Sequence, residues 1–512
     1  MMLYNPTMAT LSWLLALCVV VLVSADNDDP ECSHSLANSL TELDPNLKEM
    51  TYDIGNGPET TLVYVDPPVA SYYQIPELQN MEVPTEVQPV RPKFNGFQGK
   101  FINLSAKPVT LYWEDRAGGT KHPMRQHKPF SSSGTATFPS HRFYFCEPNQ
   151  PDAVLKFMKV GQYPENLYFY DPYFVEGDPA ETERNLKVLS DAERERYDKW
   201  RLTLAFNEFY VNATGRSYLA NYLRPRPRHP MWRADYFGQE HWVTTKETQF
   251  VQMPPSEELQ DVPRTGTGRK LAHDQPRLLA EYRDPNKTIL NMTLKVLSCS
   301  PRAFEISNFL SPTEVQHILD VAGGHKLSLS KTGDGPGSEK DDSRRTRTSF
   351  NSWVSRETSP IMDAIYRRAA DLQLVDEALM RHRTPEEVPD LASKRPLTEQ
   401  LQLVHYGPGQ EYTAHHDFGF AHVDQAQQGA RFSTLLLYLN EGMDGGETSF
   451  PRYVNGETFH KLKVKPEVGK AILFYSQLPD GNMDDFSHHA AEPIREGEKW
   501  LMNLWFWDPV YS

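Results

Sequence analysis

The sequence predicts an α+β protein of several domains, whose C-terminal part is a strand-rich barrel or sandwich supported by helices. Three observations lead to this prediction. The chain of 512 residues is long enough for about three domains of ordinary size. Short segments in which apolar and polar side chains alternate, as they do in half-buried strands, gather in two separate regions. Segments with helical periodicity precede the second region, and helices followed by many antiparallel strands suit a packed sheet with supporting helices.

The first 97 residues are not expected to form a packed domain. Residues 8–25 are apolar and end in small side chains before an acidic stretch. This pattern predicts a cleaved secretory signal peptide or a marginal membrane anchor, so residues 1–25 are assigned to one of these two. Residues 26–97 are polar and contain prolines without sustained periodicity, which indicates a partly ordered lead-in. Either alternative for residues 1–25 places the remainder in the secretory pathway: in the lumen of the endoplasmic reticulum, at its membrane, or secreted.

A small β-sandwich is predicted for residues 98–150. Residues 100–105, 109–113 and 141–145 alternate like strands, and residues 118–119 and 131–134 are typical of turns. Residues 151–222 form a mixed segment, in which 183–207 contain apolar positions that predict one or two helices. Residues 223–294 contain an Arg-Pro-Arg-Pro run and a Thr-Gly-Thr-Gly run, which predict a linker.

The predicted sandwich resembles the β-domain of the von Hippel-Lindau protein over about 50 residues. The resemblance rests on Asn103, Ser105, Val109 and Trp113, followed by a polar loop and His141. Since that family recognises hydroxyproline, the resemblance implies a hydroxyproline-binding module. The alternative is a generic β-module that packs on its neighbour.

The C-terminal domain is predicted from residue 295 to residue 512. Ser311 and Glu314 form a capping box with Pro312 at the first helical position, and apolar residues then recur at helical spacing up to Gly323. Ser359 and the proline after it open a second helix. The strands that follow are predicted at residues 401–406, 412–418, 432–439, 471–475 and 499–507.

A possible metal site lies on the second of these strands. His415 and Asp417 share one face of a strand, whereas His416 points away. One of the later histidines, His488 or His489, could complete a site with two histidines and one carboxylate. Such a site suits non-haem Fe(II) because it leaves three positions open, and zinc normally leaves fewer. The triplet alone is weak, since 17 histidines and 68 acidic residues in 512 positions produce about two by chance.

The last predicted strand places a lysine among aromatic side chains. Lys499, Leu501, Asn503, Trp505 and Trp507 alternate along this strand and therefore share one face. A buried ammonium without a partner is costly, so an anion is expected beside Lys499.

Six motifs in order, spread over about residues 295–509, resemble the prolyl 4-hydroxylase family of Fe(II)/2-oxoglutarate dioxygenases. They lie at residues 301–311, at 345–349, at Tyr406 nine residues before His415, at 431–439, at 445–451 with 479–481, and at 485–500. In this family the distal histidine ligand precedes, by ten residues, a lysine followed by tryptophan. That interval joins His489 to Lys499 and excludes His488.

The resemblance implies a double-stranded β-helix, or jelly roll, and a set of site residues. The iron ligands implied are His415, Asp417 and His489, and the catalytic set adds Lys499, which would bind the distal carboxylate of 2-oxoglutarate. The residues implied near the cosubstrate are Lys499, Tyr406, Thr448 and Trp505. The peptide-contacting residues implied are Arg347, Ser349, Glu399, Tyr412 and Arg431. The alternative for Tyr406 and Thr448 is strand packing and turn chemistry, and that for the peptide-contacting set is a solvated surface.

The activity implied is hydroxylation of peptidyl proline, at C4, with Fe(II), 2-oxoglutarate, O2 and L-ascorbate as cofactors and with succinate and CO2 as products. Two departures from the family pattern affect peptide specificity: Leu504 and Trp507 flank Trp505, and Ala490 to Glu492 replace Gly-Gly-Cys. A dioxygenase for another substrate, such as peptidyl lysine, therefore stays open. So does a non-catalytic adaptor that binds hydroxyproline.

Composition excludes some functions and leaves others open. The net charge of −15 and the absence of long basic runs argue against nucleic-acid binding. One disulfide could form among Cys32, Cys146 and Cys299, with no pairing preferred. The sequons at Asn103, Asn212, Asn286 and Asn291 are typical of a glycoprotein. A proline-containing protein or peptide is the expected partner, and no oligomeric state is indicated.

Overall fold

The computed structural model describes most of the chain from residue 96 onward. The described residues are 48–49, 63–64, 96–115, 119–221, 223–224, 226–251, 287–330, 346–384, 386–389, 394–418, 430–452 and 462–508. The predicted signal peptide or anchor lies outside them, as does most of the predicted lead-in. Strands β1 (Lys48–Glu49) and β2 (Val63–Tyr64) pair with each other and belong to one compact unit, and the residues from 96 onward belong to another. Among the described residues, no helix has the length and apolar character needed to cross a membrane.

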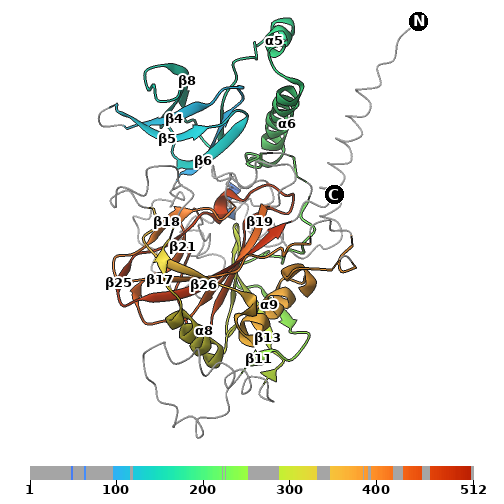
Figure 1. Cartoon of the computed structure of the whole chain (residues 1–512), viewed down its shortest axis with the longest axis vertical. Coiled ribbons are helices and arrows are strands. Elements are labelled where there is room, and N and C mark those ends of the chain that lie inside the picture. Colours follow the sequence, from blue (N-terminus) through green and yellow to red (C-terminus); the bar gives the residue numbers. More distant parts are fainter. Residues whose placement is uncertain are drawn as a thin grey trace, which may run out of the picture. The chain divides into compact units, whose positions relative to one another are not determined.

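The predicted β-sandwich is present, and it continues beyond residue 150. Its strands are β3 (Phe97–Asn103), β4 (Val109–Glu114), β5 (Lys121–His127), β6 (Ser131–Thr137), β7 (Arg142–Cys146), β8 (Val154–Lys159) and β9 (Leu167–Tyr170). They form two sheets, in the orders β6-β3-β9 and β5-β4-β7-β8 (Figure 1). Phe97 and Phe101 of one sheet share a buried core with Leu111, Phe143 and Phe145 of the other. We call residues 96–170 the β-module.

One turn predicted within the β-module is wrong. Residues 131–134 were expected to form a turn because three serines and a glycine are typical of one. They instead begin β6, which pairs with β3 along its whole length. Small polar side chains do not prevent pairing when the opposite strand supplies the buried apolar surface, as Phe101 and Ile102 do here.

The predicted helical segment forms two helices that pack on the β-module. Helix α5 (Pro179–Leu186) is followed by α6 (Asp191–Thr214), which has a capping box at Ser190 and ends at Gly215 with a φ of 68°. Trp200 of α6 is fully buried, and its indole N–H donates to the Phe130 carbonyl at 3.2 Å.

The C-terminal part is mostly β, with few helices. Its large sheet has nine strands in the order β10-β13-β14-β23-β19-β26-β17-β16-β15. Their bounds are β10 (Glu240–Thr244), β13 (Asn291–Cys299), β14 (Arg302–Ile306), β15 (Ser328–Leu329), β16 (Phe350–Val354), β17 (Leu401–Tyr406), β19 (Ala430–Tyr438), β23 (Ala471–Tyr475) and β26 (Lys499–Asp508). A smaller sheet has the order β18-β24-β21-β22 and contains β18 (Tyr412–His415), β21 (Thr448–Phe450), β22 (Leu462–Val464) and β24 (His489–Ala491). Two further pairs are β20 (Asp444–Gly445) with β25 (Ile494–Glu496), and β11 (Phe250–Val251) with β12 (Lys287–Thr288).

The large and small sheets pack face to face. Leu436, Phe474 and Leu501 of the large sheet share one buried cluster with Phe450 and Val464 of the small one. The opposite face of the large sheet packs against helices α8 (Pro312–Gly324) and α9 (Pro360–Leu372), both of which begin at the predicted caps (Figure 1). Three 3-10 turns complete this part: η4 (Arg356–Thr358), η5 (Glu377–Met380) and η7 (Asp485–Ser487).

The structure differs from the predicted linker at residues 223–294. Part of it, residues 252–286, lies outside the described residues. Around that part, β10 and the first residues of β13 pair with each other within the large sheet. Met292 and Leu294 are buried and alternate with more exposed neighbours along β13, a strand pattern that the proline- and glycine-rich surroundings hid. The linker is therefore wrong for β10 and β13.

Candidate active site

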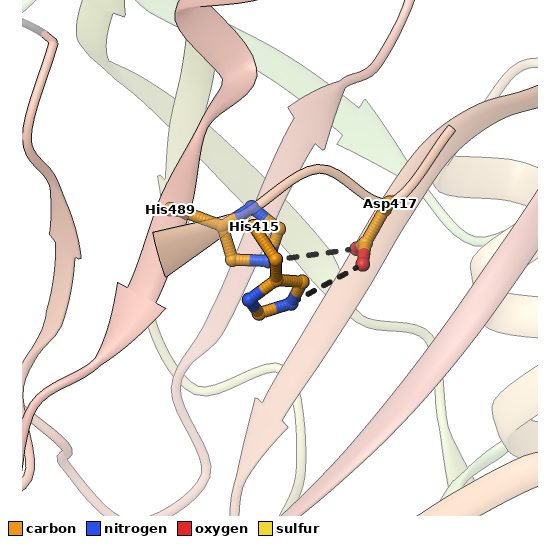
Figure 2. Close-up of side chains that lie close together, drawn as sticks. All are labelled: His415, Asp417 and His489. Atoms are coloured by element: carbon orange, nitrogen blue, oxygen red, sulfur yellow. Dashed lines mark ion pairs between the residues drawn. The ribbon is translucent and has the colours of Figure 1, made fainter. Parts of the chain in front are cut away.

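Two paired strands bring the three predicted metal ligands together. His415 ends β18 and lies directly opposite His489, which begins β24, and Asp417 follows two residues after His415. One potential ligand atom from each of the three residues lies within 4.8 Å of the others. The Asp417 carboxylate is 3.6 Å from Nε2 of each histidine, as the dashed lines in Figure 2 show. No other group of this kind occurs among the described residues.

Backbone carbonyl groups determine which nitrogen of each histidine faces the site. His415 Nδ1 lies 2.9 Å from the Thr413 carbonyl oxygen, and His489 Nδ1 lies 2.9 Å from that of Ser487. A carbonyl oxygen only accepts hydrogen bonds, so both Nδ1 atoms must carry the proton. The two Nε2 atoms are therefore unprotonated when the rings are neutral, and their lone pairs point to the Asp417 carboxylate. This is the usual arrangement for histidines that bind a metal.

Neighbouring side chains orient the Asp417 carboxylate. Its Oδ2 atom accepts hydrogen bonds from the Thr434 hydroxyl at 2.6 Å and from the Trp505 indole N–H at 3.0 Å. Both donors come from central strands of the large sheet, β19 and β26, and are therefore rigidly placed. The oxygen Oδ1 accepts neither of these bonds and is directed to His415.

The protonation states of the site favour a cation. Burial and the neighbouring His489 hold the pKa of His415 well below its ordinary value, which keeps the ring neutral. Burial raises the pKa of Asp417, but His489, His415 and Arg431 more than offset that effect, and the net pKa lies below its ordinary value. Two imidazole nitrogens and one carboxylate form the donor set that suits Fe(II) with open positions. The residues present therefore fit the implied metal.

Lys499 contacts the buried cluster between the two sheets, and Phe450 and Phe474 of that cluster contact His489. Lys499 is fully buried at the start of β26, opposite Tyr406 of β17, and its ammonium donates to the Gly446 carbonyl at 2.6 Å. The ammonium is 5.6 Å from the ring centre of Tyr406 and 5.5 Å from that of Tyr438. The Tyr438 hydroxyl donates to Thr448 at 2.6 Å. Lys499, Tyr406 and Thr448, all predicted near the cosubstrate, are thus brought together, with Tyr438 between Lys499 and Thr448.

Burial lowers the pKa of Lys499 to about 7, and Glu447 only partly opposes this effect. Among the described residues, no carboxylate lies within ion-pair distance of the Lys499 ammonium. An anionic ligand would supply the missing charge, so the buried ammonium of Lys499 fits the distal carboxylate of 2-oxoglutarate.

The residues predicted to contact the peptide fall into two groups. In the first, Arg347 stacks over Tyr412 at 4.7 Å, and the Tyr412 ring lies 3.5 Å from the His415 ring. Ser349 is fully buried and accepts a hydrogen bond from Arg347 at 2.9 Å, so it holds the Arg347 guanidinium in place. The solvated-surface alternative does not describe Arg347 or Ser349, since both are buried.

The second group lies beside Asp417. Arg431 forms a bidentate ion pair with Glu399, at 2.6 and 3.0 Å, and stacks over Trp505 at 4.0 Å. Trp507, one of the departures from the family pattern, donates its indole N–H to Glu399 at 3.0 Å. This departure therefore adds a hydrogen bond to the Arg431–Glu399 pair.

Sequence reasoning missed two residues of the site, Thr434 and Tyr438. Both lie on β19 within the predicted strand at residues 432–439, four positions apart and thus on the same face. That spacing indicates that the two side chains share a face with the site, but a threonine and a tyrosine in a strand are most often packing residues.

Comparisons with known proteins agree with this geometry. Residues 401–507 match the family described as the 2OG-Fe(II) oxygenase superfamily. Probable prolyl 4-hydroxylase 3 of Arabidopsis thaliana is 31% identical over 223 residues, which cover 41% of this chain and 71% of that protein. Prolyl 4-hydroxylase 1 of the same organism is 32% identical over 226 residues, covering 42% and 72%. A viral collagen prolyl hydroxylase from Paramecium Bursaria Chlorella virus-1, solved as a 2-oxoglutarate complex, is 22% identical, with a TM-score of 0.28 and with 40% of this chain and 95% of that chain covered. The identity and coverage of the two Arabidopsis thaliana proteins show that the chain belongs to the prolyl 4-hydroxylase family.

Proposed function

We propose that this protein is an Fe(II)- and 2-oxoglutarate-dependent dioxygenase that hydroxylates peptidyl proline at C4. The observation that carries the proposal is the convergence of His415, Asp417 and His489, with both Nε2 atoms facing one carboxylate, next to the buried ammonium of Lys499. Family membership supports the same reaction, since the named relatives are prolyl 4-hydroxylases.

Strand order supports assignment of the C-terminal domain to the jelly-roll class. Eight strands divide between two packed sheets as β17-β26-β19-β23 and β18-β24-β21-β22. The first strand in the chain thus pairs with the last, and the chain crosses repeatedly between the sheets, as in a double Greek key. The iron site would lie between the sheets, where β18 and β24 supply the ligands and β19 and β26 orient them.

The residues of the site divide the work as follows. Bound iron, 2-oxoglutarate and O2 would supply an oxidative decarboxylation that yields succinate, CO2 and the oxidant for the substrate, with L-ascorbate as the reductant that the family implies. His415, Asp417 and His489 would hold the metal. Lys499 would bind the distal carboxylate, and the Tyr406 and Tyr438 rings would exclude water from it. Thr434 and Trp505 keep the Asp417 carboxylate oriented.

The substrate side of the site suits an extended, proline-containing peptide. Trp353 is 43% exposed, and its ring lies 6.0 Å from that of Trp505. Together with Tyr412 it presents aromatic surface near the ligands, and aromatic surfaces commonly bind proline-rich segments. Arg347 stacks on the Tyr412 ring and Arg431 on the Trp505 ring, and these contacts fix the orientation of the two rings.

Mass spectrometry of a peptide library incubated with protein, Fe(II) and 2-oxoglutarate tests the proposal. We expect a gain of one oxygen on proline, stoichiometric with succinate, and fragmentation should place the hydroxyl at C4. Hydroxylated lysine would contradict the proline assignment and favour the alternative substrate. Peptide binding without any succinate release would favour the non-catalytic adaptor.

A matched pair of variants identifies the distal ligand. His489→Ala should abolish turnover because it removes an Nε2 atom from the site. His488→Ala, which changes the adjacent histidine, should retain turnover, since His488 faces His416 at 4.8 Å between ring centres. The reverse result would move the ligand by one residue and contradict the placement of β24.

We also propose that the protein acts in the secretory pathway, on the basis of residues 1–25 and the sequons. Asn212 and Asn291 are exposed and available for glycosylation, and Asn286 lies outside the described residues. Asn103 is fully buried, and its amide donates to the Lys107 and Lys128 carbonyls at 2.8 and 3.0 Å. Glycopeptide mapping of protein expressed in a eukaryotic secretory host should find glycan on Asn212 or Asn291 and none on Asn103. A glycan-free protein in the cytosol would contradict the proposal.

A further inference from the structure

We infer that the β-module is a positioning element of the metal site, because it holds the turn that places His489. This inference rests on the proposed metal site. The β-module would position this site within the same chain, whether or not the β-module itself binds a ligand.

The turn before His489 determines one side of the ligand's position. Strand β24 fixes His489 from the C-terminal side through its pairing with β18. On the N-terminal side, the η7 turn (Asp485–Ser487) supplies the Ser487 carbonyl that accepts the His489 Nδ1 proton. Asp484 caps this turn by accepting from the Phe486 N–H at 3.0 Å. A shift of the turn would therefore rotate the His489 ring.

The β-module contacts this turn through a buried backbone donor. The Gln98 N–H of β3 donates to both carboxylate oxygens of Asp485, at 3.1 and 3.2 Å, across 387 residues of sequence. The Asp485 carboxylate also forms an ion pair with Arg452, and the Asp485 carbonyl accepts from His416 Nε2 at 3.0 Å. His416 stands between the ligands His415 and Asp417 in the chain. Asp485 thus connects the β-module to both ligand-bearing segments.

Further contacts hold the loop that leads into the turn. The Leu219 N–H donates to the Asn482 side chain at 2.8 Å, and the Asn482 amide donates to the Ser217 carbonyl at 3.0 Å. The Tyr210 hydroxyl of α6 donates to Asp480 at 2.6 Å. These residues are tied to the β-module in turn, because the buried Lys100 ammonium of β3 donates to the Ala220 carbonyl at 2.8 Å.

The Gln98 N–H can be removed without breaking the β-module's own sheet. Gln98 and Lys100 are two positions apart on β3, so their N–H groups point to the same side. The Lys100 N–H points away from β6 toward β9 and bonds to the Asn166 carbonyl. Pairing of β3 with β9 begins only at Lys100, so the Gln98 N–H lies beyond the end of that ladder. Proline is tolerated in a strand where its missing N–H is not part of a ladder. Gln98→Pro therefore deletes the bond to Asp485, and Gln98→Ala is the matched control that keeps the N–H.

The experiment measures Mn(II) affinity of the full chain, in the presence of 2-oxoglutarate and without O2, by electron paramagnetic resonance. Changes to partners behind a metal ligand commonly weaken metal binding by about 10- to 100-fold. We expect a loss in this range for Gln98→Pro and a change below about threefold for Gln98→Ala. Circular dichroism and heat unfolding show whether each variant is folded. If Gln98→Pro fails to fold, Lys100→Met replaces it, because it removes the β-module's bond to the Ala220 carbonyl, with an expected loss of several-fold.

Two failures are distinguishable in this experiment. If the unaltered protein does not bind Mn(II), the proposed metal site itself is wrong. If the unaltered protein binds Mn(II) and folded Gln98→Pro, or its replacement Lys100→Met, binds it equally well, the positioning role of the β-module is overturned.

Discussion

Replacement of Lys499 by methionine should weaken 2-oxoglutarate binding and, at the same time, stabilise the protein that has no cosubstrate bound. Methionine keeps the apolar stem among the Tyr406 and Tyr438 rings and removes only the charge. The two effects have one cause: a fully buried ammonium whose only hydrogen bond in the described structure goes to the Gly446 carbonyl. Such an ammonium is unfavourable until an anion binds beside it.

The magnitudes follow from the pKa of Lys499. Burial lowers it from an ordinary 10.5 to about 7, which at about 1.4 kcal/mol for each tenfold change corresponds to about 5 kcal/mol against the charged form. Methionine removes this cost but leaves the Gly446 carbonyl without its donor, at about 1–3 kcal/mol. We therefore expect the free energy of unfolding to rise by about 2–4 kcal/mol at pH 7. Loss of the charge pair should weaken 2-oxoglutarate binding by about 3–5 kcal/mol, or about two to four powers of ten.

The pH dependence has a definite sign. The folded pKa lies below the unfolded one, so the unfolded state binds more protons between about pH 7 and pH 10.5, and the stability of the unaltered protein rises with pH across that window. The stabilisation by Lys499→Met should thus be largest at or below pH 7, and near pH 10.5 it should become a destabilisation of about 1–3 kcal/mol, because only the lost bond to the Gly446 carbonyl remains. Binding of 2-oxoglutarate to the unaltered protein should weaken up to tenfold per pH unit above about 7, because Lys499 must first gain a proton.

Isothermal titration with 2-oxoglutarate on the Mn(II)-loaded protein, between pH 6 and 9, measures the affinity, and denaturant unfolding measures the stability. Binding of a proline-containing peptide is the control and should change little. An unchanged 2-oxoglutarate affinity together with weakened peptide binding would refute the role of Lys499 and assign it to the substrate.

Three further predictions follow from the described contacts. His415→Ala should abolish Mn(II) binding measured by paramagnetic resonance, whereas His416→Ala should lower it by at most about a hundredfold, because His416 supports Asp485 and does not face the metal; equal losses in the two variants would contradict the ligand assignment. Trp505→Phe removes a donor to Asp417 and should weaken metal binding by about 10- to 100-fold without unfolding the protein, so full affinity in this variant would show that the indole N–H has no orienting role. Arg368→Ala should lower the free energy of unfolding by about 3–5 kcal/mol in denaturant titrations, since it leaves the fully buried Glu314 carboxylate without its partner; a loss below about 1 kcal/mol would refute this account.

The interior of the C-terminal domain was largely readable from local sequence patterns. The capping box at Ser311 and Glu314 and the cap at Ser359 predicted the starts of α8 and α9, because a cap involves only residues within one helical turn. Alternation also separated His415 and Asp417 from His416, although the strand is shorter than predicted: β18 ends at His415, and Asp417 lies in the bend that follows. The choice of His489, in contrast, came from the family resemblance and not from the local pattern.

Other features depended on segments that are distant in sequence. Strand β10 and the first residues of β13 were assigned to a linker, because nothing local shows that β13 pairs with both β14 and β10. Arg368 connects α9 to α8 and to the Gln249 carbonyl, a contact that holds part of this segment in place. The composition of a segment indicates how flexible the isolated segment is. It does not indicate the surface on which the segment packs in the folded protein.

The sequence by itself indicated the chemistry of this protein: His415 and Asp417 as metal ligands, and Lys499 as a lysine that expects an anion. The tertiary structure decided how that chemistry is oriented. Thr434 and Trp505 hold the Asp417 carboxylate, and Gln98 of the β-module reaches Asp485 across 387 residues. The physical reason is that side-chain identity and periodicity are local, whereas a hydrogen-bond partner is selected by packing among elements that meet only in the folded chain.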